Sequence, residues 1–454
     1  SSANTTTGSI YDNICKMSET LKIIGGKKLC GEATPVPNKN AVLAALAACL
    51  LTDGTVTYKN VPDTTDVRKI LQILNMLGAR IDQTKPTEVN INCRSVNSFK
   101  LDQELGSSIR SSILFAGPLL VRFGQARIPL PGGCVLGKRA ISAHVDAFAK
   151  VGIGATFDAD GVLFTAPKAK SAHYDVWMME ASVTATENLA MYAAGTSGHF
   201  VITEAACEPH VRQLLELLSS MGADISGIGS NKLEIDGRTK LKAANFTPEP
   251  DFVDIAGLIV AAAVTKGKVT IKNACLPLVV DGLVQCFEKF HIDIKRKEND
   301  LEVDGNRELF IDPINSGFPL AGEDLPKLVP RPWPGFPIDV LPVMVTLACK
   351  TKGRLLIQNW MYETGLDFVG ELNALGANIF VADPQRIVVN GPVNFRGGRV
   401  TSPSVIQACK AIFLASLADP VETIIVGADI LKRRYPDIVD VYRTLGANVE
   451  SVED

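Results

Sequence analysis

Six stretches of helical length are apolar at most of their positions, and Ala, Val, Ile and Leu dominate them. They span residues 41–51, 111–121, 185–194, 255–264, 340–348 and 405–417. A helix that lies on a surface carries a polar face, whereas these stretches are apolar on nearly every face. We therefore predict six helices that are each surrounded by other elements.

A run of alternating apolar and polar residues follows each predicted helix, as a half-buried strand would require. These runs begin at residues 54, 124, 198, 267, 353 and 421. A second helix then ends in a glycine before another strand begins, which is typical of a helix C-cap. The glycines are Gly78, Gly152, Gly222, Gly376 and Gly446, and His291 occupies the corresponding place in the fourth copy. The sequence therefore contains six copies of one α/β unit, with a period of roughly 70 residues.

Length and linker composition indicate two domains of three units each. The chain has 454 residues, more than the ~250–300 at which a single core stops growing. The segment Thr247–Asp251, rich in proline and acidic residues, marks one crossing between domains, and Pro35–Asn40 marks another. We predict one domain over residues 39–249, a second from residues 21–38 plus 250–454, and a disordered tail over residues 1–20.

Composition excludes several functional classes. The net charge of −3 gives no reason to expect nucleic acid or an anionic membrane as a partner. No apolar run reaches the ~18 residues of a membrane span. The ten cysteines are scattered singly, and no histidine cluster has metal-ligand spacing. We therefore expect a reduced, cytoplasmic protein without a metal site.

Two cations stand where the predicted buried helices begin. Ser, Asn and Asp at such places are ordinary N-caps. Lys39 and Arg110 are not, because a cation is disfavoured at the positive end of a helix dipole. Helix N-termini favour anions. If all six helices point the same way, their N-termini meet at one cleft that binds an anionic ligand.

The stretch Pro131–Arg139 combines three glycines, a thiol and two cations. Its glycines favour a loop, and Lys138 and Arg139 favour the thiolate form of Cys134. The loop therefore offers a tunable acid or nucleophile beside anion-binding groups. A tight turn with a small buried Cys134 is the alternative.

These features together resemble the enolpyruvyl transferases that act on UDP-N-acetylglucosamine. The resemblance rests on the six repeats and on Lys39-Asn40, Gly117–Gly124, the Pro131–Cys134 loop and Phe336–Asp339. The related enzymes of the shikimate pathway share the fold but lack the cysteine loop, so they match less well. The resemblance implies a two-domain inverse α/β barrel of six βαβαββ-type repeats. It also implies transfer of the enolpyruvyl group of phosphoenolpyruvate to the sugar 3-hydroxyl with release of phosphate, the first committed step of peptidoglycan synthesis, without a cofactor.

The resemblance also implies roles for individual residues. Cys134 would be the general acid, could bond covalently to phosphoenolpyruvate and would be alkylated by fosfomycin. Asp339 would take the proton of the acceptor hydroxyl. Lys39 and Arg139 would neutralise carboxylate and phosphate. The acceptor site would comprise Arg110 at the diphosphate, Asn40 at the sugar, and Ala140, Ile141, Ser142, Ala143, Ser182, Val183 and Met361.

Several positions depart from the family pattern, and two of these departures lie on the phosphoenolpyruvate side. Gly365 and Gln407 stand where the family has phosphate-binding arginines. Losing two hydrogen bonds from charged groups would weaken phosphoenolpyruvate binding by about 3–6 kcal/mol. Lys410, or a residue of Lys432–Arg434, could replace them.

Three hypotheses remain open from the sequence. The chain is an active transferase for UDP-N-acetylglucosamine, a transferase for another nucleotide such as UMP, or a non-catalytic paralogue that binds a sugar nucleotide. Retention of Cys134, Lys39, Arg139 and Asp339 favours catalysis. The expected partners are phosphoenolpyruvate and a UDP-sugar or UMP, bound by a monomer.

Overall fold

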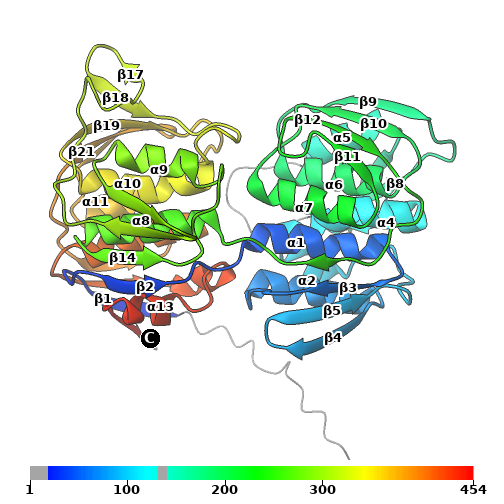
Figure 1. Ribbon diagram of the computed structural model, residues 1–454, viewed down its shortest axis with the longest axis horizontal. Helices are drawn as coiled ribbons and strands as arrows, with labels where there is room; N and C mark the ends of the chain where they lie inside the picture. Colours follow the sequence, from blue (N-terminus) through cyan, green and yellow to red (C-terminus); the bar gives the residue numbers. More distant parts are fainter. Residues whose placement is uncertain (1–18, 131–140, 453–454) are drawn as a thin grey trace, which may run out of the picture.

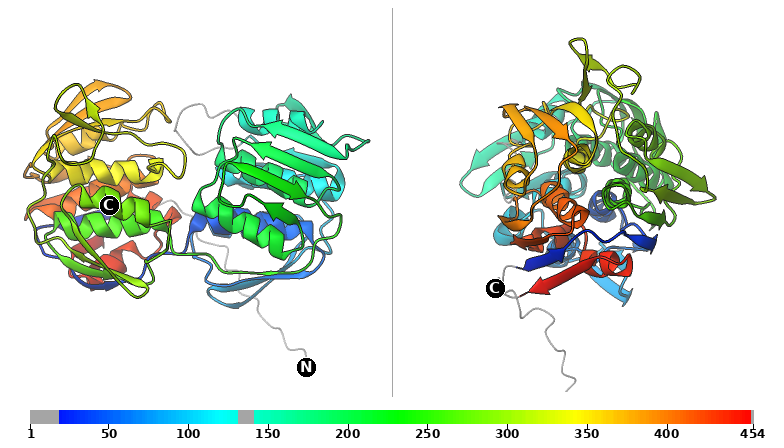
Figure 2. Two further views of the ribbon diagram at one scale, coloured as in Figure 1. Left: turned by 45° about the horizontal axis from the view of Figure 1, so that its top comes forward. Right: turned by 90° about the vertical axis from the view of Figure 1, so that its left-hand side faces the viewer.

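The computed structural model describes residues 19–130 and 141–452. Figure 1 shows two lobes of similar construction side by side, each with helices running along the long axis of the molecule and sheets around them. The left-hand view in Figure 2 shows the same two-lobed arrangement. Within the described residues the strands form six sheets. The α/β unit predicted six times from the sequence is thus repeated in space.

The lobe on the right of Figure 1 contains α1 to α7. Its helices are α1 (Lys39–Ala48), α2 (Thr65–Met76), α3 (Gln103–Ser107), α4 (Ala116–Phe123), α5 (Ser142–Lys150), α6 (Val183–Ala194) and α7 (Pro209–Ser220), with 3-10 turns η1 (Cys49–Leu51) and η2 (Arg110–Phe115). One sheet has the order β13 (Asn245–Phe246), β3 (Thr55–Tyr58), β5 (Glu88–Asn92) and β4 (Arg80–Lys85). The second is β6 (Gln125–Ile128), β8 (Gly161–Thr165) and β7 (Gly154–Asp158). The third is β11 (Asp224–Ser226), β12 (Lys232–Asp236), β10 (His199–Thr203) and β9 (His173–Trp177).

The other lobe combines the first strands of the described chain with its C-terminal half. Its helices are α8 (Phe252–Val264), α9 (Asp281–Glu288), α10 (Leu341–Cys349), α11 (Val369–Ala374), α12 (Ile406–Ala418) and α13 (Ile438–Thr444), with 3-10 turns η3 (Ile338–Val340) and η4 (Ala428–Arg433). One sheet has the order β22 (Gly398–Thr401), β23 (Glu422–Val426), β1 (Thr20–Ile24) and β24 (Asn448–Val452). The second is β15 (Asp293–Lys297), β16 (Asp300–Asp304), β14 (Lys268–Ile271) and β2 (Cys30–Ala33). The third is β17 (Leu320–Ala321), β18 (Leu325–Leu328), β19 (Gly353–Gln358), β21 (Arg386–Gly391) and β20 (Ile379–Asp383).

The chain crosses between the lobes in two segments that lie against each other. The backbone N–H of Asn38 donates to the carbonyl of Glu249 at 2.8 Å, and that of Asp251 donates to Val36 at 2.8 Å. Each lobe has its own buried apolar cluster, one between Ala41 and Phe246 and the other from the remaining parts of the chain. Thr20, which the sequence assigned to the tail, is already paired with Val452 in the sheet.

The buried helices match their prediction, with two corrections at their starts. Every residue of α8 is buried, as the apolar pattern required. The stretches predicted as helices over 111–121 and 340–348 instead begin as the 3-10 turns η2 and η3 before α4 and α10. Pro118 and Pro342 lie near these transitions. Because proline lacks an N–H and its ring clashes with the carbonyl four residues earlier, a regular α-helix cannot extend backwards through it.

The fourth repeat keeps the helix C-cap without a glycine. Gly78, Gly152, Gly222, Gly376 and Gly446 have φ between 82° and 110°. His291 has φ 64°, so it adopts the same left-handed region. This conformation costs a residue with a side chain roughly 1–2 kcal/mol. The His291 ring stacks on Phe310 with centroids 3.6 Å apart, which offsets part of that cost.

Candidate active site between the lobes

Lys39 is buried at the start of α1, with only 6% of its surface exposed. Asn38 provides the N-cap by accepting from the Ala41 N–H at 3.2 Å, so Lys39 has no capping role. Its Nζ donates to Oδ2 of Asp66 at 2.8 Å. Asp66 lies in the first turn of α2, which Thr64 caps. The cation that the sequence singled out is therefore held by a carboxylate from the neighbouring helix.

Asp66 also binds a cation from the opposite lobe. Arg433, at the end of η4, donates from Nε to Oδ1 at 3.1 Å and from Nη2 to Oδ2 at 3.3 Å. Burial would raise the pKa of Asp66, but Lys39 and Arg433 outweigh burial and lower it. Burial lowers the pKa of Lys39, partly opposed by Asp66. Two cations from different lobes thus share one carboxylate where the lobes meet.

Arg434, the residue after Arg433, pairs with two carboxylates, Asp251 and Asp339. It donates to the Asp251 carboxylate from Nε at 2.6 Å and from Nη2 at 2.8 Å, and Asp251 caps α8. Nη1 of Arg434 lies 3.6 Å from Oδ2 of Asp339. The Asp339 side chain is 38% exposed, whereas those of Arg434 and Asp251 are 5% and 0% exposed. Asp339 is therefore an accessible carboxylate on a rigid, buried support.

A second group of predicted residues gathers at the starts of η2, α5 and α6. Arg110 opens η2, Ser182 is the N-cap residue of α6, and Val183 packs partly against the apolar cluster. Burial, helped by the charge of Arg110, lowers the pKa of His144 on α5 to about 3. His144 therefore stays neutral, and its Nε2 lies 3.0 Å from Oγ1 of Thr184. Ala143, next to His144, is buried.

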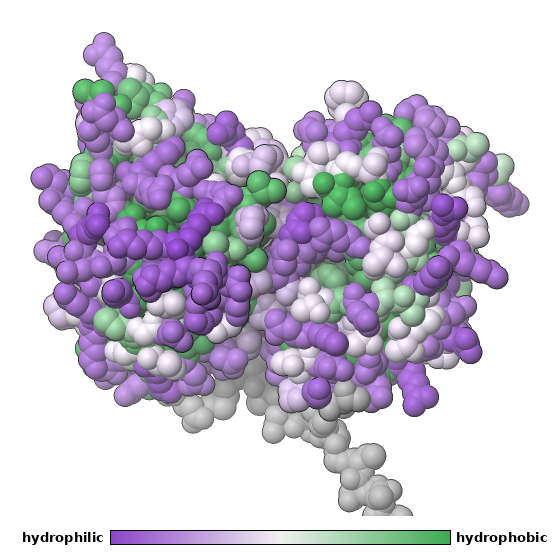
Figure 3. Space-filling model, viewed as in Figure 1, coloured by the Kyte–Doolittle hydropathy of each residue, from purple (hydrophilic) through white to green (hydrophobic). Residues whose placement is uncertain are grey.

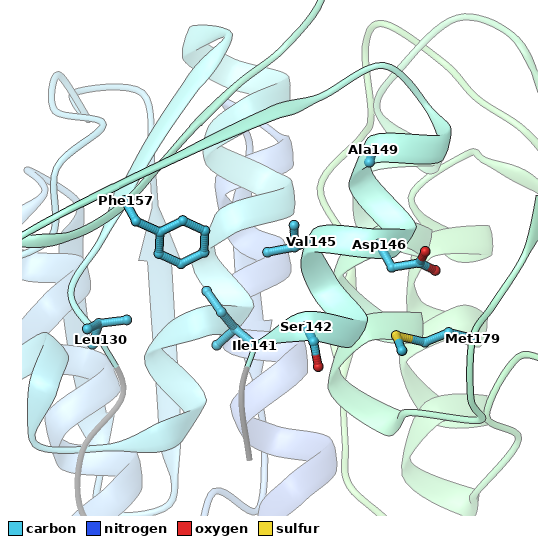
Figure 4. A pocket seen from close by; sticks show the side chains of 8 residues that line it. All are labelled: Leu130, Ile141, Ser142, Val145, Asp146, Ala149, Phe157 and Met179. Atoms are coloured by element: carbon cyan, nitrogen blue, oxygen red, sulfur yellow. The ribbon is translucent and has the colours of Figure 1, made fainter. Parts of the chain in front are cut away.

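The remaining predicted residues are more scattered. Ile141 and Ser142 line an apolar groove of about 540 Å³ together with Leu130, Val145, Asp146, Ala149, Phe157 and Met179. In Figure 4 the Ile141 side chain points towards Phe157 and Leu130, whereas Ser142 points away from them. Asn40 on α1 and Met361 after β19 are half-buried. Cys134, Arg139 and Ala140 lie outside the described residues.

The structure explains why glycine stands at position 365, and at position 407 it leaves the glutamine with an unpaired donor. A Cβ atom on Gly365 would lie 1.9 Å from Nδ2 of Asn359, so an arginine does not fit there without a shift of Asn359. Gln407 is buried on α12 and accepts from the Tyr435 hydroxyl at 3.0 Å. Its Nε2 has no hydrogen-bond partner within the described chain. Gln407 can therefore still donate one neutral hydrogen bond to a ligand.

Of the cations suggested as replacements, only Arg433 bridges the lobes to the Lys39–Asp66 pair. Lys410 is 1% exposed, and its Nζ lies 3.7 Å from Asp254 of the same lobe. It also lies 4.3 Å and 4.5 Å from the ring centroids of Tyr435 and Tyr442. Lys432 pairs with Glu19 at 2.8 Å.

Lys410 should leave a pH signature in stability. Burial lowers its pKa in the folded protein to about 8, against ~10.4 in an unfolded chain. Between these values the unfolded chain binds more protons, so stability rises with pH. We expect wild type to gain up to ~3 kcal/mol across this window relative to Lys410→Met. Urea unfolding of both proteins at pH values from about 7.5 to about 10.5 measures this difference in the free energy of unfolding. The exposed Lys352→Met is the control, and equal slopes in all three proteins would contradict the assignment.

Several buried acidic and basic groups near the site were missed from the sequence. Burial is the main cause that raises the pKa of Glu208 to about 7, and the charge of Asp339 adds to it. Glu187 on α6 is 2% exposed, and burial raises its pKa well above the usual range. His210 on α7 is held neutral by burial, with a pKa of about 4. The only signal was the polar pair Glu187-Asn188 inside a largely apolar helix. Asp66 had no such signal.

The space-filling view in Figure 3 shows a furrow between the lobes.

Within residues 19–130 and 141–452, no three His, Cys, Asp or Glu side chains are placed to hold a metal ion. None of the helices in that part of the chain has the length and apolar character needed to cross a membrane.

Comparisons with known proteins agree with this arrangement. The family profile described as EPSP synthase (3-phosphoshikimate 1-carboxyvinyltransferase) matches residues 23–442. The UDP-N-acetylglucosamine 1-carboxyvinyltransferase of Bradyrhizobium diazoefficiens is 36% identical over 95% of this chain and 97% of its own length. The enzyme of the same name from Treponema denticola is 35% identical over 95% of this chain and 99% of its own length.

Solved structures resemble the fold. The enolpyruvyl transferase NikO from Streptomyces tendae superposes with a TM-score of 0.83 at 20% identity, covering 96% of this chain and all of that one. EPSP synthase from Acinetobacter baumannii superposes with a TM-score of 0.72 at 18% identity, with 96% and 100% coverage.

Proposed function

Because this chain belongs to the EPSP synthase family of carboxyvinyltransferases, we propose that it transfers the enolpyruvyl group of phosphoenolpyruvate to the 3-hydroxyl of UDP-N-acetylglucosamine and releases phosphate. The names of relatives 35–36% identical over 95% of the chain support this acceptor. One structural observation carries the proposal. Lys39 and Arg433 share the single carboxylate of Asp66, and Arg434, the residue after Arg433, lies 3.6 Å from the accessible carboxylate of Asp339.

The two cations suit a substrate that carries a carboxylate and a phosphate. Lys39 and Arg433 are only partly neutralised by Asp66, and Gln407 Nε2 is a further buried donor. An anion that enters between the lobes competes with Asp66 for both cations. Such preorganised donors stabilise charge without reorganisation during the reaction.

Asp339 is suited to activate the acceptor hydroxyl. It removes the hydroxyl proton as the oxygen attacks C2 of phosphoenolpyruvate, and an acid delivers a proton to C3. Loss of phosphate from C2 and of one proton from the new methyl group then restores the double bond. Cys134, which lies outside the described residues, is our proposed acid.

Arg433 is expected to carry part of the missing arginines' function. Arg433→Ala should raise KM for phosphoenolpyruvate by about 10–150-fold, because a hydrogen bond from a charged group contributes about 1.5–3 kcal/mol. The KM for UDP-N-acetylglucosamine should change much less. Steady-state kinetics with each substrate varied in turn measures both values. Lys432→Ala is the matched control, since Lys432 pairs with Glu19. An unchanged KM in Arg433→Ala would remove Arg433 from the phosphoenolpyruvate site.

The acceptor is tested by phosphate release. Phosphoenolpyruvate is supplied with UDP-N-acetylglucosamine, UMP or shikimate 3-phosphate, and release is expected with the first alone. Release with UMP alone would overturn the acceptor assignment, and no release with any acceptor would leave a non-catalytic paralogue. The UMP alternative is not favoured, because relatives 35–36% identical over 95% of this chain are named UDP-N-acetylglucosamine 1-carboxyvinyltransferases.

The proposal extends to the cell. The product would be the first committed precursor of peptidoglycan, and a monomer would make it in the cytoplasm. Fosfomycin would block the enzyme by alkylating Cys134. The two lobes would act as the domains 39–249 and 21–38 plus 250–454.

A further inference from the structure

A buried histidine on α5 contacts two residues that stand one turn apart on α6. Thr184 and Asn188 are four positions apart, so they lie on the same side of that helix. Helices α5 and α6 pack against each other in the right-hand lobe of Figure 1. Nε2 of His144 lies 3.0 Å from Oγ1 of Thr184, and its Nδ1 lies 3.1 Å from Nδ2 of Asn188. Each ring nitrogen of His144 therefore has its own partner on α6.

The hydrogen bonds of Asn188 decide which nitrogen of His144 carries the proton. The backbone N–H of Gly117 donates to Oδ1 of Asn188 at 2.8 Å, and Nδ2 donates to the backbone carbonyl of Ile113 at 2.7 Å. Because a backbone N–H can only donate and a carbonyl can only accept, the orientation of the Asn188 amide is fixed. Nδ2 therefore also donates to Nδ1 of His144. Burial lowers the pKa of His144 to about 3, so the ring is neutral and its Nε2 carries the proton.

This tautomer leaves the hydroxyl of Thr184 with a proton to donate. Because Oγ1 of Thr184 accepts from Nε2–H of His144, its own O–H bond points away from the imidazole. Within residues 19–130 and 141–452, the Thr184 hydroxyl has no hydrogen-bond partner other than His144. His144 is 5% exposed, whereas Thr184 is only half-buried. The first turn of α6 thus presents one oriented O–H donor that a ligand can reach.

Other donors and a positive charge surround this hydroxyl. Ser182 is the N-cap residue of α6, but its side chain does not cap the helix. The first N–H groups of a helix have no partner within it, and with the helix dipole they favour an anion. The charge of Arg110 acts on His144, which places this guanidinium close to the same helix start. Glu180 precedes Ser182, but it is exposed, so solvent and salt screen its charge. The surroundings of Thr184 therefore suit an anionic group.

We propose that Thr184 is a further substrate-binding residue, whose hydroxyl donates to a diphosphate oxygen of the nucleotide acceptor, and that His144 and Asn188 are positioning residues that orient this hydroxyl. The inference rests on the proposed function, because that function supplies the nucleotide. A hydrogen bond to a charged oxygen is roughly twice as strong as one between neutral groups. A hydroxyl that is already oriented loses less rotational freedom on binding, which favours affinity.

Calorimetric titration of the full-length protein with UDP tests the hydroxyl. Thr184→Val keeps the shape of the side chain but removes the donor, so it should bind UDP about 10–150-fold more weakly. Thr184→Ser keeps the donor and should bind nearly as wild type does. Thr165→Val, at an exposed position of β8, is the matched control and should not change binding. Equal affinity of wild type and Thr184→Val, or a serine variant as weak as the valine variant, would overturn the role of Thr184.

Steady-state kinetics separates a lost substrate contact from a folding defect. Thr184→Val should raise KM for UDP-N-acetylglucosamine by the factor seen in UDP binding, with a much smaller change in kcat. A lower kcat at unchanged KM would instead mean less folded enzyme and would contradict the contact. If wild type releases no phosphate with UDP-N-acetylglucosamine, the proposed transfer fails, whereas the UDP titrations still decide whether Thr184 binds the diphosphate.

A double-mutant cycle and NMR spectroscopy test the positioning residues. His144→Phe should weaken UDP binding in the wild-type background but not in the Thr184→Val background, because His144 acts through the hydroxyl. In wild type labelled with ¹⁵N-histidine, the His144 ring should carry its proton on Nε2, and Thr184→Val should shift that signal. A proton on Nδ1, or an equal loss of UDP affinity in both backgrounds, would overturn the positioning role. The NMR measurement uses the wild-type protein, so it decides the tautomer even if His144→Phe does not fold.

Discussion

Asp339→Asn should lower kcat by about 10²–10⁴-fold, the usual contribution of a positioned general base. Asparagine keeps the shape of the side chain but cannot accept the hydroxyl proton. The site should otherwise stay intact, because Arg434 remains tied to Asp251 by two hydrogen bonds. Phosphate release at saturating concentrations of both substrates measures the effect, and calorimetry should show phosphoenolpyruvate binding close to that of wild type.

The matched control for Asp339 is Asp324→Asn. Asp324 is an exposed carboxylate of the same lobe that pairs with Arg354 at 3.2 Å. Its kcat should equal that of wild type. If Asp339→Asn also keeps a normal kcat, another group removes the hydroxyl proton, and Glu208 would be the next residue to test.

Lys39→Met should lower kcat/KM for phosphoenolpyruvate by about 10²–10³-fold, the effect of losing one preorganised donor at developing charge. Lys39 is buried at a helix N-terminus, so solvent cannot replace its charge. The variant also leaves Asp66 with Arg433 as its remaining partner, which makes the site less positive. Steady-state kinetics and phosphoenolpyruvate binding by calorimetry measure the loss.

Two further variants separate charge from folding in the Lys39 experiment. Lys59→Met removes an exposed lysine of the same lobe and should have no effect. Asp66→Asn in the Lys39→Met background restores the charge balance and should recover part of the lost binding. If Lys39→Met only lowers the melting temperature and keeps normal kcat/KM, Lys39 is a structural ion-pair partner.

The fold was largely predictable because its signals are local. The apolar faces of α8 and the glycine C-caps can be read from a few neighbouring residues. The fourth cap shows the same point, since His291 adopts the conformation that glycine has elsewhere. The errors were local as well. Pro118 and Pro342 changed how two helices begin, and the apolar pattern alone did not reveal this.

The candidate site was predictable only in part. Lys39 was identified because a cation at a helix start violates the dipole preference. Its partner Asp66 was missed, because a carboxylate in the first turn of α2 is ordinary. The loss of arginine at Gly365 and Gln407 was visible, but the sequence did not reveal that Lys410, one suggested substitute, is buried against Asp254.

The repeated unit, the buried helices and the family could all be predicted from the amino-acid sequence, because periodicity and caps depend on neighbours along the chain. Which charges meet became clear from the three-dimensional arrangement. Asp66 and Arg433 are 367 residues apart, and they touch because the two lobes come together. His173 and His199 are likewise separated by α6 and become neighbours through parallel pairing of β9 and β10. Coulomb interactions act through space, so no pattern along the chain marks these partners.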